Sequence, residues 1–164
     1  MGLLGFGNVG SALAGQITVR SEAIAERTGI SLRITRVAVR DLSRKRPGLD
    51  RRRATDDPSL VVSAPDVDVV VELMGGTEPA RELVLMALRN GKPVITGNKE
   101  LIAAHGAELF AAADKAGVDL LFEAAVGGGI PIIRPLRESL IGEQIQRVLG
   151  IVNGTTNYIL TKMA

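Results

Sequence analysis

Cysteine is absent from the 164 residues of the sequence, and aromatic residues make up only 2% of it. Without cysteine the chain has no disulfides, which favours a reducing compartment. With so few aromatics the core must be aliphatic, as in a parallel sheet covered by helices on both faces. No run reaches the roughly 18 apolar residues of a membrane span, and residues 1–4 lack the basic start of a signal peptide. These absences predict a cytoplasmic protein with no membrane partner.

The charge is nearly balanced, with 20 Lys and Arg against 18 Asp and Glu. The resulting formal charge of +2 is too small to indicate nucleic-acid binding, so no nucleic-acid partner is expected. Hydrophobic residues at 46% and charged residues at 23% place the chain among globular proteins. Its length corresponds to one domain, or to one domain and the start of another.

Short apolar runs alternate along the chain with longer amphipathic ones, which is typical of βαβ units. Strands are expected at 2–6, 32–39, 67–73, 93–96 and 118–123, and helices at 9–27, 58–63, 78–90 and 98–115. The polar segment 41–57 is expected to be a loop. After residue 130 the pattern predicts a helix, a strand at 145–152 and the start of a further helix.

We therefore expect an α/β fold with a doubly wound, mostly parallel, Rossmann-like sheet in residues 1–130. Residues 131–164 are expected to begin a second domain that is incomplete. The first strand has few residues before its glycine turn, and the last helix stops without a cap. Both features indicate a truncated chain.

Residues 5–10 read GFGNVG, a GxGxxG motif between the first strand and the first helix. Gly5 permits a tight turn, Gly7 lets the backbone approach a diphosphate, and Gly10 allows the helix to pack closely on the strand. Backbone N–H groups of residues 6–10 then face the phosphates at the positive end of the helix. Because the chain has 19 glycines, a plain structural turn is the alternative. The place of the motif in its βαβ unit favours dinucleotide binding.

The second strand ends at Arg40 and Asp41. An NAD site usually has an acidic residue here for the ribose hydroxyls, whereas the planar guanidinium of Arg40 can hold a 2′-phosphate in a bidentate manner. NADP is therefore favoured over NAD, and Asp41 leaves dual use open. Further basic residues follow between positions 44 and 53. They could add charge to the phosphate site, but a solvated surface loop is the favoured interpretation.

Three further motifs follow expected strands. Gly75 and Gly76 allow the backbone to pass close to a bound ribose or nicotinamide, and Thr77 can cap the next helix. Lys99 lies in the first turn of a helix, where the dipole disfavours a cation, so a contact with a carbonyl or with the nicotinamide amide is favoured over simple exposure. Glu123 beside the glycines 127–129 could ligate a hard cation through oxygen, although a plain turn is the favoured interpretation from chemistry alone.

Taken in order, the motifs GLLGFGNVG, VAVRD, ELMGG, TGNKE, EAAVGGGIPII and GIVNGTTNYIL resemble the homoserine dehydrogenase family over essentially all 164 residues. TGNKE, EAAVGGGIP and NGTTNYIL are far more specific than the glycine turn. The resemblance implies NAD(P)H-dependent interconversion of L-aspartate 4-semialdehyde and L-homoserine, a step toward threonine, isoleucine and methionine. It also implies that residues 131–164 begin the substrate and dimerisation domain, and that the complete enzyme is a homodimer.

The resemblance also implies roles for individual residues. The dinucleotide contacts Phe6, Asn8 and Val9, and its 2′-phosphate contacts Arg40. Lys99 lies beside the nicotinamide and the substrate, and is the candidate catalytic residue. A sodium-like cation is held by the side chain of Glu123 and by the carbonyls of Val126, Gly128 and Ile130. The amino-acid end of the substrate contacts Gly154 and Thr155.

The sequence stops before a later segment that, in the family, supplies an Asp and a Lys for proton transfer. This chain is therefore expected to bind cofactor but to turn over poorly. Two alternatives stay open. Another semialdehyde or amino-acid oxidoreductase could share the cofactor domain, although aspartate-semialdehyde dehydrogenase needs a nucleophilic cysteine, which this chain lacks. A non-catalytic NAD(P)-binding module would bind the cofactor without turnover.

Overall fold

The chain folds around one parallel sheet. The structure, a computed structural model, describes residues 1–150 and 154–163. Its strands are β1 (Gly2–Leu4), β2 (Arg36–Ala38), β3 (Ala54–Thr55), β4 (Val70–Glu72), β5 (Val94–Thr96) and β6 (Leu120–Leu121). Every pairing is parallel, and the order across the sheet is β3-β2-β1-β4-β5-β6. The predicted α/β class is confirmed, and the order reverses between β1 and β4, where doubly wound sheets bind their ligands.

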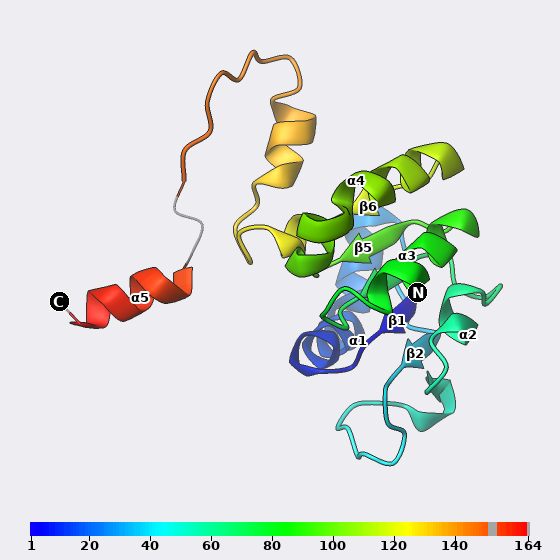
Figure 1. Cartoon of the computed structure of the whole chain (residues 1–164). Coiled ribbons are helices and arrows are strands. Elements are labelled where there is room, and N and C mark those ends of the chain that lie inside the picture. The colour runs from blue at the N-terminus through cyan, green and yellow to red at the C-terminus, as the bar shows by residue number, and fades with distance from the viewer. Residues whose placement is uncertain (151–153, 164) are drawn as a thin grey trace.

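Helices cover both faces of this sheet (Figure 1). The helices over the sheet are α1 (Asn8–Thr28), α2 (Ser59–Val62), α3 (Ala80–Arg89) and α4 (Lys99–Ala116), whereas α5 (Gly154–Met163) is separate from it. Successive strand residues point to opposite faces. Leu4 and Val70 therefore pack with residues of α2, α3 and α4, whereas Leu3 and Val71 pack on the face that α1 covers. The core is aliphatic, as the composition predicts, and is divided by the sheet into two layers.

The helix ends follow local sequence. α4 begins after Asn98, whose side-chain Oδ1 accepts the N–H of Leu101 at 3.1 Å. α1 and α4 end at Gly29 and Gly117, as the glycine positions predict. α1 begins after Gly7, which has no side chain and makes no side-chain cap hydrogen bond. The positive end of α1 is therefore left open at the carboxyl edge of the sheet.

Three expectations differ from the structure. The loop expected at 41–57 contains β3, whose two residues are too few to show a strand pattern in sequence. The helix expected after residue 130 is reduced to short helical turns, including a π-helical one at Pro135–Ser139. The strand expected at 145–152 is wrong over 145–150, which have no regular secondary structure, and 151–152 lie outside the described residues. A strand needs a neighbour for its N–H and C=O groups, and no strand of the described sheet pairs with this segment.

After β6 the chain leaves the sheet, and α5 lies apart from it (Figure 1). Ile141 and Leu149 of this last part are 81% and 84% exposed. Across 1–150 and 154–163, no helix combines the length and apolar character needed to cross a membrane.

Candidate functional site

The turn between β1 and α1 requires glycine at Gly5 and Gly10. Gly5 has φ +97°, and a Cβ there would lie 2.8 Å from the carbonyl oxygen of Leu73. A Cβ on Gly10 would collide with the carbonyl oxygen of Gly5. These contacts bring the first turn of α1 against the end of β1. Leu73 N–H also donates to Leu4 O at 2.8 Å, which fixes the neighbouring loop to the same strand end.

Gly7 has a different surrounding. A Cβ at Gly7 would have no heavy atom within 4 Å, so the backbone of this residue faces open space. The first N–H groups of a helix have no acceptor within the helix, and α1 has no side-chain cap to supply one. The open space and the free amides together form a place where an anionic group can approach the positive end of α1.

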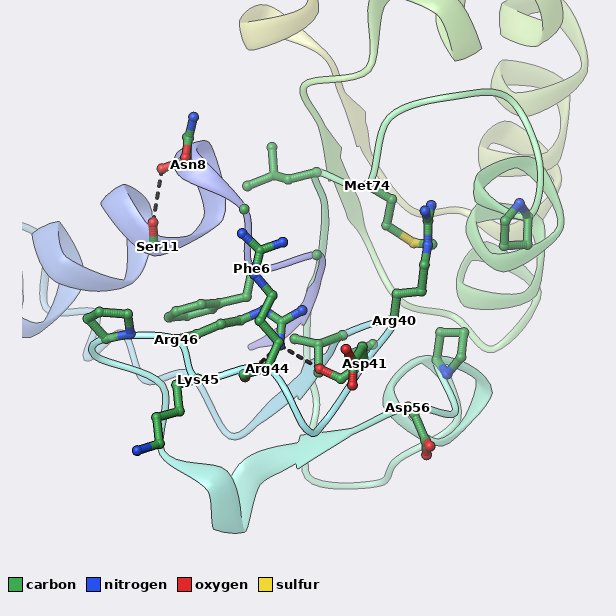
Figure 2. A pocket seen from close by; sticks show the side chains of 18 residues that line it. Phe6, Asn8, Ser11, Arg40, Asp41, Arg44, Lys45, Arg46, Asp56 and Met74 are labelled. Atoms are coloured by element: carbon green, nitrogen blue, oxygen red, sulfur yellow. Dashed lines mark hydrogen bonds between the residues drawn. The ribbon is translucent and has the colours of Figure 1, made fainter.

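A cavity of about 850 Å³ lies in front of this turn (Figure 2). Its volume is within the range of sites that hold small molecules and cofactors. The residues that line it are Gly5, Phe6, Gly7, Asn8, Ser11, Ala38, Val39, Arg40, Asp41, Arg44, Lys45, Arg46, Pro47, Asp56, Pro58, Leu73, Met74 and Pro79. They come from the loops that follow β1, β2, β3 and β4, so the cavity lies at the carboxyl edge of the sheet where the strand order reverses.

Several predicted cofactor residues line this cavity and others do not. Gly5, Phe6, Gly7, Asn8 and Arg40 line it. The remaining predicted cofactor residues are Val9, Gly10, Gly75, Gly76, Thr77 and Lys99, and none of them is among the lining residues. Sequence reasoning did not identify Ser11, Asp56 or Met74, because their places depend on how the loops converge rather than on a local motif.

Arg40 is exposed at the cavity and forms no hydrogen bond or ion pair within the described part of the chain. Its neighbour Asp41 is already engaged: its carboxylate accepts the hydroxyl of Ser43 at 2.6 Å and the N–H of Ser43 at 2.8 Å. The Ser43 hydroxyl, followed by its N–H, lowers the pKa of Asp41 below its ordinary value. The strand end therefore presents an unpaired guanidinium beside a carboxylate that stays ionised.

The basic loop after Arg40 needs a partial correction. Sequence reasoning favoured a solvated loop for residues 44–53, yet Arg44, Lys45 and Arg46 line the cavity. Arg46 also holds the loop in shape, because its guanidinium donates to the carbonyls of Asp41 at 2.6 Å and Arg44 at 3.1 Å. Arg44 and Lys45 are nevertheless exposed, so the loop is both solvated and part of the cavity wall.

The later arginines of that run fit the solvated interpretation. Arg51 and Arg53 donate to the backbone carbonyls of Leu42 and Ile34, each at 2.8 Å. Arg52 pairs with Asp50, which is the N-cap of the 3-10 turn Arg51–Arg53. None of these arginines lines the cavity of Figure 2.

A buried polar network joins the loops after β4 and β5. Glu72 is 0% exposed, and its carboxyl oxygens accept the N–H of Met74 at 2.7 Å and the hydroxyl of Thr96 at 2.6 Å. The Thr96 hydroxyl accepts the N–H of Asn98 at 3.0 Å. The Asn98 side-chain amide donates to Gly76 O at 2.6 Å. Sequence reasoning gave these side chains no role, although an acid at the end of an apolar strand was the available signal.

Lys99 and Thr77 flank this network. Lys99 is the first residue of α4 and is exposed, at the same edge of the sheet as the glycine turn because all strands are parallel. The expected cap by Thr77 is wrong. α3 begins at Ala80 after Pro79, which is its N-cap, and within the described residues the Thr77 side chain makes no hydrogen bond. Thr77 meets the start of α3 through its backbone instead, because its carbonyl oxygen accepts the N–H of Arg81 at 2.8 Å.

Glu123 binds backbone amides in this structure. Its carboxylate accepts the N–H groups of Ile132 at 2.6 Å, Ile133 at 3.0 Å and Arg134 at 2.7 Å. Desolvation raises the pKa of Glu123, but the amide hydrogen bonds outweigh it and the net pKa lies below the ordinary value.

The carbonyls of Val126, Gly128 and Ile130 accept no hydrogen bond from any described residue. No group of His, Cys, Asp and Glu side chains suited to a metal ion occurs within the described ranges. A cation in the 126–130 turn would therefore be held by backbone oxygens and a single carboxylate. The positions predicted to contact substrate, Gly154 and Thr155, begin α5.

The comparisons with known proteins agree on one family. A family model described as "Homoserine dehydrogenase, NAD binding domain" matches residues 5–123, and one described as "Homoserine dehydrogenase" matches residues 131–164. The homoserine dehydrogenase of Corynebacterium glutamicum is 52% identical over 161 residues, which are 98% of this chain and 36% of that protein. That of Bacillus subtilis is 45% identical over 164 residues, 99% of this chain and 38% of that protein.

Solved structures give the same result. The homoserine dehydrogenase of Thiobacillus denitrificans superposes with a TM-score of 0.89 at 50% identity, covering 99% of this chain and 38% of that one. A hyperthermophilic archaeal homoserine dehydrogenase in complex with NADPH superposes with a TM-score of 0.77 at 32% identity, covering 99% and 55%. The chain thus spans little more than a third of the length of the curated relatives that it matches.

Proposed function

Because the chain belongs to the homoserine dehydrogenase family, we propose that it is the NAD(P)-binding part of an enzyme that interconverts L-aspartate 4-semialdehyde and L-homoserine. The observation that carries this proposal is the cavity at the switch point, with the open space at Gly7 on one side and the unpaired Arg40 on the other. The amides at the start of α1 bind the diphosphate, and Phe6 and Asn8 line the same wall. When bound, the cofactor supplies or accepts the hydride.

NADP is the preferred cofactor in this proposal, because Arg40 has no partner among the residues that the structure describes and its guanidinium matches a phosphate. Isothermal titration of the chain with NADPH and NADH tests this. We expect Arg40→Ala to weaken NADPH binding about tenfold or more, the effect of losing one charge-assisted pair, while NADH binding changes little. Arg52→Ala is the matched control, since Arg52 pairs with Asp50 outside the cavity. Equal losses for both cofactors would contradict the preference.

Lys99 is the proposed catalytic residue of this chain. Its ammonium, at the carboxyl edge of the sheet beside the nicotinamide half, stabilises the charge that develops on the substrate oxygen during hydride transfer. In the full-length enzyme we expect Lys99→Ala to lower homoserine oxidation about 100-fold or more, with NADPH affinity nearly unchanged. Lys115→Ala, at the other end of α4, is the control. A full-length enzyme that binds NADPH and never oxidises homoserine would identify a non-catalytic module instead.

A monovalent cation, which we take to be sodium, is proposed to bind the Glu123 carboxylate and the carbonyls of Val126, Gly128 and Ile130. The unpaired carbonyls of the turn and the lowered pKa of Glu123 support this. Replacing choline chloride by sodium chloride at constant ionic strength should raise the unfolding temperature of the wild type. The same exchange should leave Glu123→Gln unchanged, and an equal rise in both proteins would exclude the site.

Residues 1–130 are proposed to be the NAD(P)-binding domain and 131–164 the start of a substrate domain. Separate family models for 5–123 and 131–164 support this division. Gly154 and Thr155 are proposed to contact the amino-acid end of the substrate, and the complete enzyme is proposed to be a homodimer. The mass of the full-length protein in solution tests the dimer directly.

A further inference from the structure

Glu72 is a buried acid that the proposed reaction does not use. It ends β4 with 0% exposure, and a carboxyl group without access to water costs free energy unless it is hydrogen-bonded. An aliphatic residue would fill the same space without that cost. What Glu72 adds is a pair of acceptors with fixed directions, one toward the Met74 N–H and one toward the Thr96 hydroxyl.

A chain of hydrogen bonds leads from Glu72 through the loop after β5 to the loop after β4. The N–H of Asn98 donates to Thr96 Oγ1, whose own hydrogen is donated to Glu72 Oε2. Asn98 then uses its side chain twice, donating to Gly76 O and accepting the N–H of Leu101. The first helical residue of α4, Lys99, follows Asn98 directly. One carboxyl group therefore links the Gly75–Gly76 loop to the start of α4.

These loops lie over one half of the sheet. In this strand order each half binds one mononucleotide, and the Arg40 side over β1, β2 and β3 holds the adenosine half. In the loop after β4, Leu73 and Met74 line the cavity beside Arg40, whereas Gly75 and Gly76 do not. We assign Gly75, Gly76 and the loop after β5, which Asn98 joins, to the nicotinamide half. From this placement we infer that Glu72 is a positioning residue, which sets the nicotinamide half-site through Thr96 and Asn98 and leaves the adenosine half untouched. The inference rests on the proposed cofactor function.

Glutamine cannot replace Glu72 in this network. If its carbonyl oxygen keeps the Met74 N–H, its amide group faces Thr96 Oγ1, which already accepts from Asn98. The hydroxyl hydrogen of Thr96 then loses its acceptor in a buried place, and the loops shift to relieve it. Thr96→Val removes the same link while keeping the shape of the side chain. Thr96→Ser keeps the hydroxyl.

The test compares two probes on this chain by isothermal titration: NADPH, which occupies both halves, and adenosine 2′,5′-bisphosphate, which occupies only the adenosine half. We expect Glu72→Gln to bind the bisphosphate within about twofold of the wild type and NADPH about tenfold more weakly, the effect of one buried hydrogen bond. Thr96→Val should show the same difference between the two probes, whereas Thr96→Ser should bind NADPH like the wild type. The double variant Glu72→Gln with Thr96→Val should lose no more NADPH affinity than either single variant.

Glu108→Gln is the matched control, because Glu108 pairs with Arg81 at the surface between α3 and α4. Equal weakening of both probes in Glu72→Gln, or unchanged NADPH binding, would overturn the inference. If Glu72→Gln does not fold, as judged by its thermal transition, Thr96→Val decides the question with the carboxyl group in place. A wild-type chain that binds neither probe would overturn the proposed cofactor function itself, an outcome distinct from a split between the probes.

Discussion

At the scale of single residues, Gly7 and Gly10 belong to one turn but meet different surroundings. A methyl group on Gly7 enters open space, whereas one on Gly10 meets the carbonyl oxygen of Gly5. We therefore expect Gly7→Ala to keep the wild-type unfolding temperature and to weaken NADPH binding about tenfold or more, since the methyl group occupies the approach of the diphosphate.

Gly10→Ala should act on stability, the property that Gly7→Ala leaves unchanged. The overlap with backbone forces α1 away from β1 and lowers the free energy of unfolding by about 1–3 kcal/mol, as overpacked positions do. Thermal unfolding and titration of both variants check the pair. A stable Gly10→Ala chain, or a Gly7→Ala chain that binds NADPH normally, would contradict this division of roles.

The positions of residues that follow a single strand end were the part of the candidate site that the sequence predicted best, while their roles stay predictions. Gly5, Gly7 and Arg40 could be placed because a local motif fixes where their backbones lie relative to one strand end. Glu72 and Asn98 were missed because their roles come from contacts between loops 22 or more residues apart in the chain. A single sequence carries no local signal for such contacts.

At the scale of elements, Lys92 connects the start of β5 with the segment between α2 and β4. It is buried, and its ammonium donates to the carbonyls of Ala64 and of Val67, the latter at 2.9 Å. Lys92→Met leaves both carbonyls without their donor, so we expect the free energy of unfolding to fall by about 1–3 kcal/mol. Chemical denaturation measures this, and Lys115→Met at the exposed end of α4 is the control. An unchanged Lys92→Met protein would show that water replaces the ammonium.

Long elements were predicted well and short ones poorly. α1 and α4 end at the glycines marked in sequence, because a left-handed residue ends a helix regardless of its tertiary surroundings. β3 was missed because it has only two residues, and they pair with β2 across the long basic loop. The strand expected at 145–152 failed over 145–150 for the opposite reason: its residues favour a strand, but they pair with no strand of the described sheet.

At the scale of the whole molecule, several carboxyl groups have pKa values below their ordinary values of 3.8 for Asp and 4.5 for Glu. Hydrogen bonds are the largest cause: Ser59 for Asp57, Arg36 for Asp66 and Arg81 for Glu108. Between the lowered and the ordinary pKa values the folded chain thus binds fewer protons than the unfolded chain. The stability that these carboxylates contribute is fully present above the ordinary pKa values and is lost as the pH falls through the lowered pKa values of the folded chain.

We therefore expect the unfolding temperature to be level from about pH 7 to about pH 5 and to fall steeply below about pH 4. Calorimetry across this range measures it. Glu108→Gln should flatten part of the fall, because one of the groups that takes up a proton has been removed. An unfolding temperature that stays constant or rises toward pH 3 would contradict the lowered pKa values.

The hydrogen bonds at the end of β1 have a consequence for how a ligand is received. Gly5 N–H donates to Ala38 O of β2 at 3.0 Å, and Leu4 O accepts the Leu73 N–H beyond β4 at 2.8 Å. A single central strand thereby spaces the loops on its two sides before any ligand arrives. A dinucleotide that contacts the loop on one side of β1 finds the loop on the other side already at a fixed distance. Little chain entropy is therefore lost on binding, and recognition depends on the side chains of these loops.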